Sequence, residues 1–196
     1  MGEIPSTTSS HSAGELVADN RDAWLLQQID ALDTEVEQRC AVILEVLREQ
    51  AIDLQTDFTE AMLRERRTSP PSERGRIGLR VRTATTSAPG MFQIEWYRVQ
   101  GKQRTKYLRR GKDKHGRPRM AYSLASFGRI TTWEEALIRE YEPQCARLRA
   151  LLHHIGQLRR STHPILREYQ ELLALRETAE PSTGPTDILP SATRLD

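Results

Sequence analysis

The residues best suited to chemistry are a dense run of cations between positions 102 and 119 of this 196-residue chain. Arginine presents a planar fork of N–H donors that fits phosphate groups and base edges, whereas lysine presents a compact positive charge. Tyr107 and Tyr122 are interleaved with them. Residues of these types at this density bind anions, so we interpret the run as a binding surface.

The charge is strongly segregated along the chain, although the net charge is only +2. Residues 64–130 contain 18 Lys and Arg against 4 Asp and Glu, a surplus of 14, which leaves the remaining residues with 11 basic and 23 acidic side chains. A basic middle between acidic arms predicts a polyanionic partner. The alternative is that the cations only protect an edge strand from aggregation, but that protection needs a few charges and not a surplus of 14. The candidate DNA-binding residues are Arg80, Arg82, Arg98, Lys102, Arg104, Lys106, Tyr107, Arg109, Arg110, Lys112, Lys114, Arg117 and Arg119.

Patterns typical of catalysis are missing from the sequence. Among the five histidines, His153 and His154 are adjacent, so they diverge on a helix, and no His-x-His pair exists. There is no Gly-x-x-x-x-Gly-Lys phosphate loop. We interpret the acidic pair Glu134 and Glu135 as a solvated helix face. We therefore expect no enzymatic activity, no metal and no cofactor.

Composition limits the class of protein. No run of 18 apolar residues is present, and the Ser/Thr-rich segment Met1 to Ser12 has no apolar core of a secretory signal. The two cysteines, Cys40 and Cys145, lie far apart and outside metal-ligand spacing, as is typical of a reducing compartment. We expect a cytoplasmic protein without a membrane partner.

Two segments have the periodicity of helices. Residues 20–66 contain neither Gly nor Pro. Ten apolar or small residues recur there, and the nine intervals between them span 33 positions, a mean spacing of 3.67 residues. They are Leu25, Ile29, Leu32, Val36, Cys40, Ile43, Leu47, Ala51, Leu54 and Phe58. A second helix is predicted over 132–160, with Thr131 or Thr132 as its N-cap. We expect Pro143 to kink or divide this helix, and a last short helix to run from Pro164 to about Arg176.

The basic middle has the period of two that is typical of strands. Apolar residues alternate with arginines over residues 76–82, and Phe92, Ile94 and Trp96 share one face of a second run. A turn at 100–101 precedes a third strand, residues 104–110, and a turn at 115–116 precedes a short fourth strand around Met120 and Tyr122. We expect Trp96 to lie in the core.

Together these patterns predict an α+β protein: a long helix, a basic antiparallel β-meander of three to four strands, and a long kinked helix that pairs with the first. The expected boundaries are 1–18 for a disordered tail, 19–66 for the long helix, 67–130 for the meander, 131–177 for the C-terminal helices and 178–196 for a second tail. Because the first helix is longer than its partner, we expect a homodimer that buries the remaining apolar stripe.

Four segments of the chain resemble the MobI-type conjugative transfer proteins, which conjugative plasmids and integrative conjugative elements encode. They are residues 73–82 (ERGRIGLRVR), 92–97 (FQIEWY), 106–112 (KYLRRGK) and 133–135 (WEE), and the resemblance extends over about residues 73–160. It implies a relaxosome accessory factor that binds double-stranded DNA at the origin of transfer. Such a factor helps a separate relaxase to begin mobilisation and does not cut DNA itself.

Two other functions fit the same residues. The helices can form a coiled-coil adaptor whose basic ribbon docks on an acidic protein, or the ribbon can bind RNA as part of a regulator. A comparison of retention on heparin and on an oligonucleotide column at rising salt separates the adaptor from the DNA-binding protein. Competition between duplex DNA and structured RNA separates the RNA-binding regulator.

Overall fold

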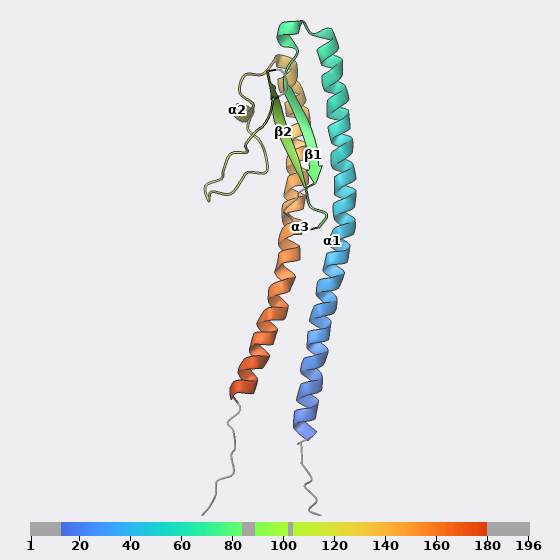
Figure 1. Cartoon of the computed structure of the whole chain (residues 1–196), viewed down its shortest axis with the longest axis vertical. Helices are drawn as coiled ribbons and strands as arrows, with labels where there is room; N and C mark the ends of the chain where they lie inside the picture. Colours follow the sequence, from blue (N-terminus) through green and yellow to red (C-terminus); the bar gives the residue numbers. More distant parts are fainter. Residues whose placement is uncertain (1–12, 84–88, 102–103, 180–196) are drawn as a thin grey trace, which may run out of the picture. The chain divides into compact units, whose positions relative to one another are not determined.

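The computed structural model describes residues 13–83, 89–101 and 104–179, and within them the chain forms an α+β fold as predicted. Figure 1 shows two long helices, which flank a small sheet in the sequence. The elements are α1 (Ala13–Thr68), η1 (Pro71–Glu73), β1 (Ile77–Thr83), β2 (Phe92–Gln100), β3 (Arg104–Tyr107), α2 (Leu124–Phe127) and α3 (Thr132–Ala179). Helix α1 begins at Ala13, within the predicted N-terminal tail of residues 1–18, and α3 ends at Ala179, within the predicted C-terminal tail of residues 178–196. The rest of both predicted tails lies outside the described residues.

The described chain divides into two compact units. One unit comprises residues 30–162 and contains the sheet, while the other is formed by residues 13–29 with residues 163–179. In the second unit the Tyr169 hydroxyl donates a hydrogen bond to Asp22 Oδ1 at 2.6 Å, and Arg176 Nη1 lies 3.5 Å from Asp22 Oδ2. The candidate site lies entirely in the first unit.

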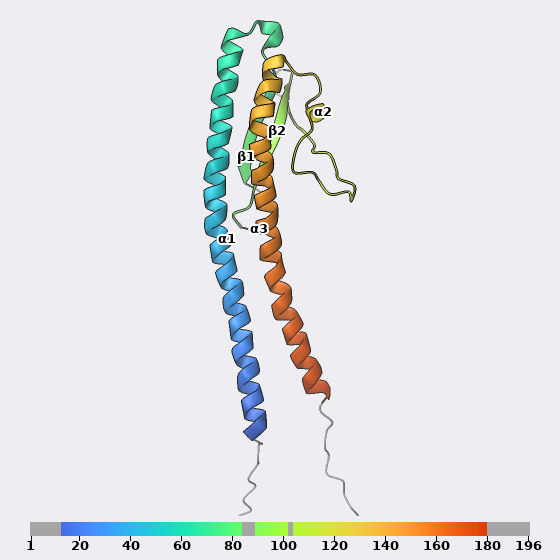
Figure 2. The same ribbon diagram turned by 180° about the vertical axis from the view of Figure 1, so that it is seen from behind.

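The sheet is antiparallel with the strand order β1-β2-β3. In the register, Leu79 pairs with Trp96, and Tyr97 pairs with both Gly78 and Tyr107. Over residues 30–162 the two helices run side by side: α3 lies behind the sheet in Figure 1 and in front of it in Figure 2, and α1 runs beside β1. Alternation along the strands therefore places one set of side chains against the helices and the other set in solvent.

The core lies between this sheet face and the helices, with Trp96 at its centre and fully buried. Its ring makes edge-to-face contacts with Phe58 of α1, at 4.9 Å between ring centroids, and with Phe127 of α2, at 5.3 Å. Phe58 also meets Tyr141 of α3 edge to face. The predicted burial of Trp96 is confirmed, and aromatic pairs of this geometry add to the stabilisation from buried area.

The buried stripe of α1 differs from the prediction at two positions. Leu32 and Ile43 are 49% and 47% exposed, and Leu44 is buried in place of Ile43. The reason is the phase of the helix, because Cys40, Leu44 and Leu47 follow steps of four and three residues that keep one face toward the core. A sequence with apolar residues at both 43 and 44 does not reveal which of them faces inward.

The prolines of α3 do not divide it, contrary to the predictions of a possible break at Pro143 and of a separate helix from Pro164. Both prolines are exposed, so the carbonyl group that each leaves without an intrahelical partner can bind water. On the opposite face Tyr141, Cys145 and Leu148 stay buried without interruption past the first proline. Tertiary packing of this face thus outweighs the local effect of the ring.

The fourth strand is absent from the described residues, and β3 is shorter than predicted because it ends at Tyr107. Residues 120–122 are not a strand, since the main-chain groups of Met120 and Tyr122 bind α3 instead of a neighbouring strand. The Met120 carbonyl accepts a hydrogen bond from Arg149 Nη1 at 2.6 Å, and the Tyr122 N–H donates to Glu142 Oε1 at 2.7 Å. Helix α3, not a strand, therefore fixes this segment.

Candidate nucleic-acid interface

The densest group of cations lies on an irregular hairpin, residues 109–119, which we call the basic hairpin. Its arms meet at an isolated bridge between Lys112 and Pro118. At its tip Asp113 Oδ1 accepts hydrogen bonds from the N–H groups of His115 and Arg117, at 2.8 and 2.9 Å. Gly116 has a φ of +76°, which suits glycine in this turn. A single carboxylate thus organises a turn that is otherwise cationic.

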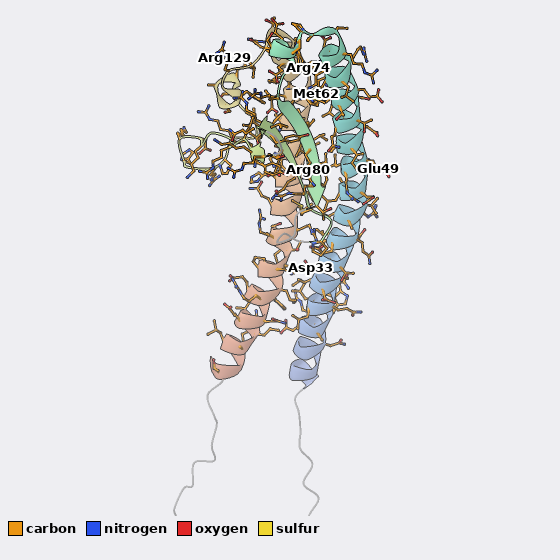
Figure 3. The ribbon with its side chains drawn as sticks, turned by 45° about the horizontal axis from the view of Figure 1, so that its top comes forward. Asp33, Glu49, Met62, Arg74, Arg80 and Arg129 are labelled. Atoms are coloured by element: carbon orange, nitrogen blue, oxygen red, sulfur yellow. The ribbon has the colours of Figure 1, made fainter. Side chains whose placement is uncertain are left out.

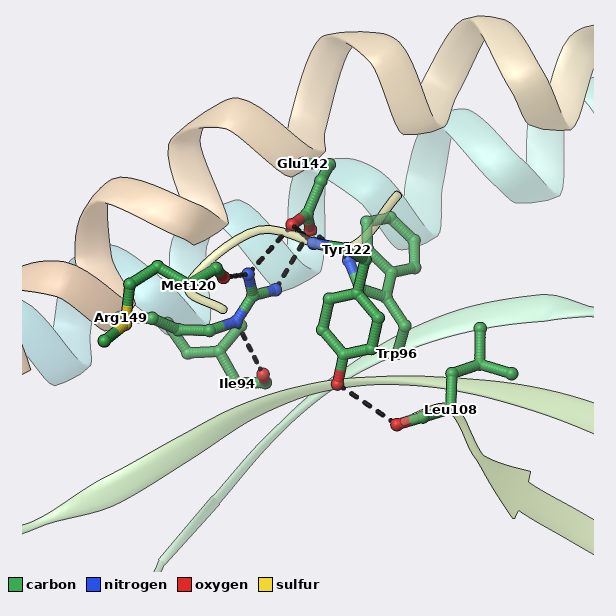
Figure 4. Close-up of polar contacts among 7 residues, drawn as sticks. All are labelled: Ile94, Trp96, Leu108, Met120, Tyr122, Glu142 and Arg149. Atoms are coloured by element: carbon green, nitrogen blue, oxygen red, sulfur yellow. Dashed lines mark hydrogen bonds and ion pairs between the residues drawn. The ribbon is translucent and has the colours of Figure 1, made fainter. Parts of the chain in front are cut away.

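A buried polar cluster, drawn in Figure 4, holds the root of the basic hairpin. Glu142 accepts hydrogen bonds from Trp96 Nε1 at 2.5 Å and from the Tyr122 N–H at 2.7 Å. Arg149, 5% exposed, binds both carboxylate oxygens of Glu142 at 2.9 and 3.0 Å and donates to the Ile94 carbonyl at 3.0 Å. Burial of two charges requires this degree of pairing. Together they join β2, α3 and the chain that follows the hairpin.

The other side of the root is also fixed. The Leu108 N–H donates to the Trp96 carbonyl at 2.8 Å, and the Tyr122 hydroxyl donates to the Leu108 carbonyl at 3.2 Å. Desolvation raises the pKa of Tyr122, so the hydroxyl keeps its proton and remains a donor. The guanidinium of Arg149 also lies over the Tyr122 ring, at 4.9 Å from its centroid. Both ends of the hairpin are therefore anchored to buried groups.

The solvent face of the sheet carries a second group of predicted residues. Arg80 donates a hydrogen bond from Nη1 to the Tyr107 hydroxyl at 2.9 Å, and Figure 3 shows Arg80 on the strand that lies near α1. Arg82 binds Gln93 at 3.0 Å, lies 3.4 Å from Glu95 and sits 5.5 Å above the Tyr107 ring. This face is cationic but internally bonded, so its arginines are less available than those of the hairpin.

Three predicted residues from the strands and the intervening turn differ in their environment. Arg98 points inward: its Nη2 donates to the carbonyls of Phe127 and Arg129, and its Nε is buried without a partner among the described residues. Lys106 is exposed on β3. Lys102 lies outside the described residues. Because two carbonyls occupy the Arg98 guanidinium, we leave it out of the proposed DNA-binding surface.

No carboxylate within residues 13–83, 89–101 and 104–179 forms an ion pair with a cation of the basic hairpin. The hairpin has six Lys and Arg against one acidic residue. Among the described residues none of the six forms an ion pair, and all but the half-buried Arg110 are exposed: Arg109, Arg110, Lys112, Lys114, Arg117 and Arg119. Elsewhere the buried arginines Arg149 and Arg159 are each paired with a glutamate. Positive charge left in solvent on a fixed turn is typical of a surface for an anionic partner.

The acidic residue Glu134 is not the solvated side chain that we expected, because it is only 5% exposed. Its Oε2 accepts from the Thr131 N–H at 2.9 Å in a capping box, as the N-cap prediction implied. Its Oε1 accepts from the N–H groups of Arg76 and Ile77 at 2.6 and 3.0 Å. Glu134 thus ties the start of β1 to the start of α3. No group of three potential metal ligands is found among the described residues.

Glu142 and Arg149 were not among the residues predicted from the sequence, although a signal was present. The two residues are seven positions apart, two helical turns, within the apolar stripe that contains Tyr141, Cys145 and Leu148. Opposite charges at this spacing on a buried face indicate an internal ion pair. Their other partners, main-chain groups of β2 and of the segment after the hairpin, carry no signal in the sequence.

The fold and the site define an α+β protein with paired long helices that carries an unneutralised cationic hairpin. A comparison with family models matches residues 47–163 to the MobI protein family. The chain belongs to the MobI family, so its role is related to conjugative mobilisation. Searches of curated proteins and of solved structures found no match. No helix in the described part of the chain is long and apolar enough to cross a bilayer.

Proposed function

We propose that this protein is a DNA-binding accessory factor of conjugative transfer, which recognises the origin of transfer in the cytoplasm and assists a separate relaxase. The observation that carries the proposal is the basic hairpin, whose six cations have no ion pair among the described residues. A fixed, exposed ribbon of this kind fits against a DNA groove, with lysines on phosphates and arginine as the better reader of guanine. The MobI membership supports the link to mobilisation.

A double substitution tests this function. Replacement of Arg109 and Arg110 by Ala removes two cations next to the root of the hairpin, so we expect loss of specific binding to origin DNA. The matched control replaces the exposed Arg39 and Arg48 of α1, which removes the same charge from surface pairs of little energetic value. Electrophoretic mobility shift with origin and scrambled duplexes measures the affinity, and circular dichroism verifies the helices.

Unchanged DNA affinity of a folded Arg109→Ala/Arg110→Ala protein would contradict the proposal. Equal losses of DNA affinity in both double variants would show that the interaction depends only on the net charge of the protein and not on the hairpin. The proposal also holds that the protein does not cut DNA. Metal-dependent nicking of supercoiled DNA by the purified protein, abolished by a single substitution of an acidic residue or histidine, would refute that part.

The proposal includes a homodimer, as is common for proteins that bind DNA. The structure changes the reason for expecting it, because α3 extends to Ala179 and is nearly as long as α1. The exposed apolar residues Val42 and Val46, 67% and 49% exposed and one turn apart on α1, offer a surface for self-association. We expect a dimer by light scattering at tens of micromolar and a monomer after Val42→Glu/Val46→Glu. A monomeric native protein at this concentration would exclude the dimer.

A further inference from the structure

A groove of about 800 Å³ lies beside the basic hairpin. One wall is the edge of β2 over residues 92–95, and the other wall is formed by both arms of the hairpin. Arg149, Leu152 and His153 line it from α3. The hairpin arginines that line it also belong to the proposed DNA-binding surface, but the DNA-binding proposal does not account for the β2 edge and the apolar side chains of the groove.

The β2 edge in this groove has no partner strand among the described residues. Strand β3 pairs only with residues 97–100 of the nine-residue strand β2. Alternate residues of β2 direct their main-chain groups to this side, because the Trp96 carbonyl accepts from Leu108 and the Ile94 carbonyl accepts from Arg149. Both carbonyls are thus occupied, and the Ile94 N–H and the main-chain groups of Phe92 are left for an added strand. An open edge of this kind is a template for an added strand, which is a recurring mode of peptide recognition.

The charge of the groove selects an acidic occupant. Four arginines of the hairpin line it, namely Arg109, Arg110, Arg117 and Arg119. The two carboxylates in the lining are both engaged, since Glu95 faces Arg82 and Asp113 binds the main chain of the turn. The guanidinium forks therefore remain for carboxylates of a ligand, which they can bind through two hydrogen bonds each.

The apolar lining favours a peptide over an unpaired nucleic-acid strand. Strands of unpaired nucleotides bind proteins by stacking bases on exposed aromatic rings. In this groove the rings of Phe92 and Tyr122 are only 3% and 7% exposed, so they present no such platform. Leu108 and Met120 are half-buried and can contact an aliphatic side chain of a peptide.

We propose that this groove binds an extended acidic peptide segment of another protein, which lies along residues 92–95 of β2 as an added strand. Four residues of edge accommodate about 13 Å of extended chain. Side chains on one face of the peptide reach the hairpin arginines, and those on the other face contact Leu108 and Met120. The site gives the protein a second partner, which shares the hairpin arginines with DNA and therefore competes with it.

Two adjacent histidines of α3 provide the variant and its matched control. His153 is half-buried and lines the groove, whereas His154 is exposed and does not line it. His153→Glu places a like charge beside the carboxylates of the peptide, while His154→Glu makes the same change in net charge outside the groove. The probe is a fluorescein-labelled ten-residue peptide of alternating Glu and Val, and fluorescence anisotropy at physiological salt measures its affinity for the full chain.

We expect His153→Glu to weaken peptide binding about tenfold, because juxtaposed like charges oppose association, and His154→Glu to leave it unchanged. Binding of duplex DNA is measured for both variants in parallel, because His153 lies beside hairpin arginines that the DNA proposal also uses. A loss of peptide binding with a smaller loss of DNA binding supports the groove, and equal losses of both would overturn it as a separate site. Circular dichroism confirms that both variants are folded.

The mode of binding is tested with a peptide in which two of the Val residues are replaced by Pro. Proline cannot donate to a neighbouring strand, so we expect this peptide to lose binding although its charge is unchanged. Equal affinity of the two peptides would overturn strand addition. Equal losses in the two histidine variants, or displacement of the peptide by a ten-nucleotide oligothymidine at lower concentration than by unlabelled peptide, would overturn the assignment of an acidic peptide to the groove.

Discussion

Glu142→Gln is the substitution for which the structure allows the largest effect to be calculated. Each carboxylate oxygen of Glu142 accepts two hydrogen bonds, from Tyr122 and Arg149 on Oε1 and from Trp96 and Arg149 on Oε2. Glutamine retains only one acceptor oxygen. Whichever way the amide turns, its NH₂ group faces two donors, and Arg149 stays buried without its counter-charge.

The expected loss of stability follows from these contacts. A buried donor left without an acceptor costs about 1–3 kcal/mol, so two donors cost about 2–6 kcal/mol. Loss of one member of a buried ion pair costs about 3–5 kcal/mol, which lies in the same range. For a chain of this size each kcal/mol lowers the melting temperature by about 2–4 °C. We therefore expect Glu142→Gln to melt about 6–20 °C below the native protein.

Thermal and urea denaturation followed by circular dichroism measure this loss, with Glu135→Gln as the control. Glu135 lies on the same helix and binds Arg139 at the surface, so its substitution should cost less than about 1 kcal/mol. The double variant Glu142→Leu/Arg149→Met removes both charges, but it leaves the N–H groups of Trp96 and Tyr122 and the carbonyls of Ile94 and Met120 without partners. It should therefore be no more stable than Glu142→Gln. A loss below about 1 kcal/mol for Glu142→Gln, or a double variant as stable as the native protein, would refute the role assigned to the buried pair.

Three further predictions test other parts of the structure. Gly75→Ala should destabilise the protein by about 2 kcal/mol or more in urea denaturation, because φ is +60° and the new Cβ would lie 2.4 Å from Trp133. Gly101→Ala, with φ of +59° and no neighbour within 4 Å, should cost only the backbone strain of about 1 kcal/mol. Lys112→Ala should lower the slope of log affinity against log salt by about 1 for all duplexes alike, and an unchanged slope would exclude a phosphate contact. Burial raises the pKa of Cys145 from 9 to about 12, so the stability that the protonated thiol contributes is full below pH 9 and is lost as the pH rises toward 12. The urea midpoints at pH 8 and pH 10 should therefore differ more in the native protein than in Cys145→Ala.

The predictions from periodicity succeeded where one face of an element is buried and the other is solvated. The alternation over residues 92–97 placed Phe92, Ile94 and Trp96 against the helices, as the structure confirms. The helix predicted over residues 132–160 is also confirmed, and its buried stripe runs from Leu137 to Leu152 in steps of three or four residues that each fall on an apolar side chain. Burial of a continuous face outweighs most local preferences, which is why its period can be read from the sequence.

The errors occurred where contacts between distant segments replace a local rule. The break expected at Pro143 ignored the buried residues on the opposite face of the helix. The strand expected around Tyr122 followed from alternation alone, whereas Glu142 and Arg149 bind the main chain there. Glu134 was interpreted as solvated because first-turn acids usually are, yet it caps two segments at once. Such long-range hydrogen bonds are invisible in the period of a single segment.

The candidate site combines a predictable property with an unpredictable one. Its charge was evident from composition, since the surplus of cations in residues 64–130 does not depend on how the segment folds. Its shape was not, because the hairpin and the groove beside it are both fixed by Arg149, which binds Ile94 on one wall and Met120 at the root of the hairpin. One buried ion pair thus gives a defined geometry to a basic segment that would otherwise repel itself. For this reason a stability measurement on Glu142 and affinity measurements on the hairpin are linked: a protein that loses the pair should lose specific binding, through the spread of hairpin conformations, before it loses its helices.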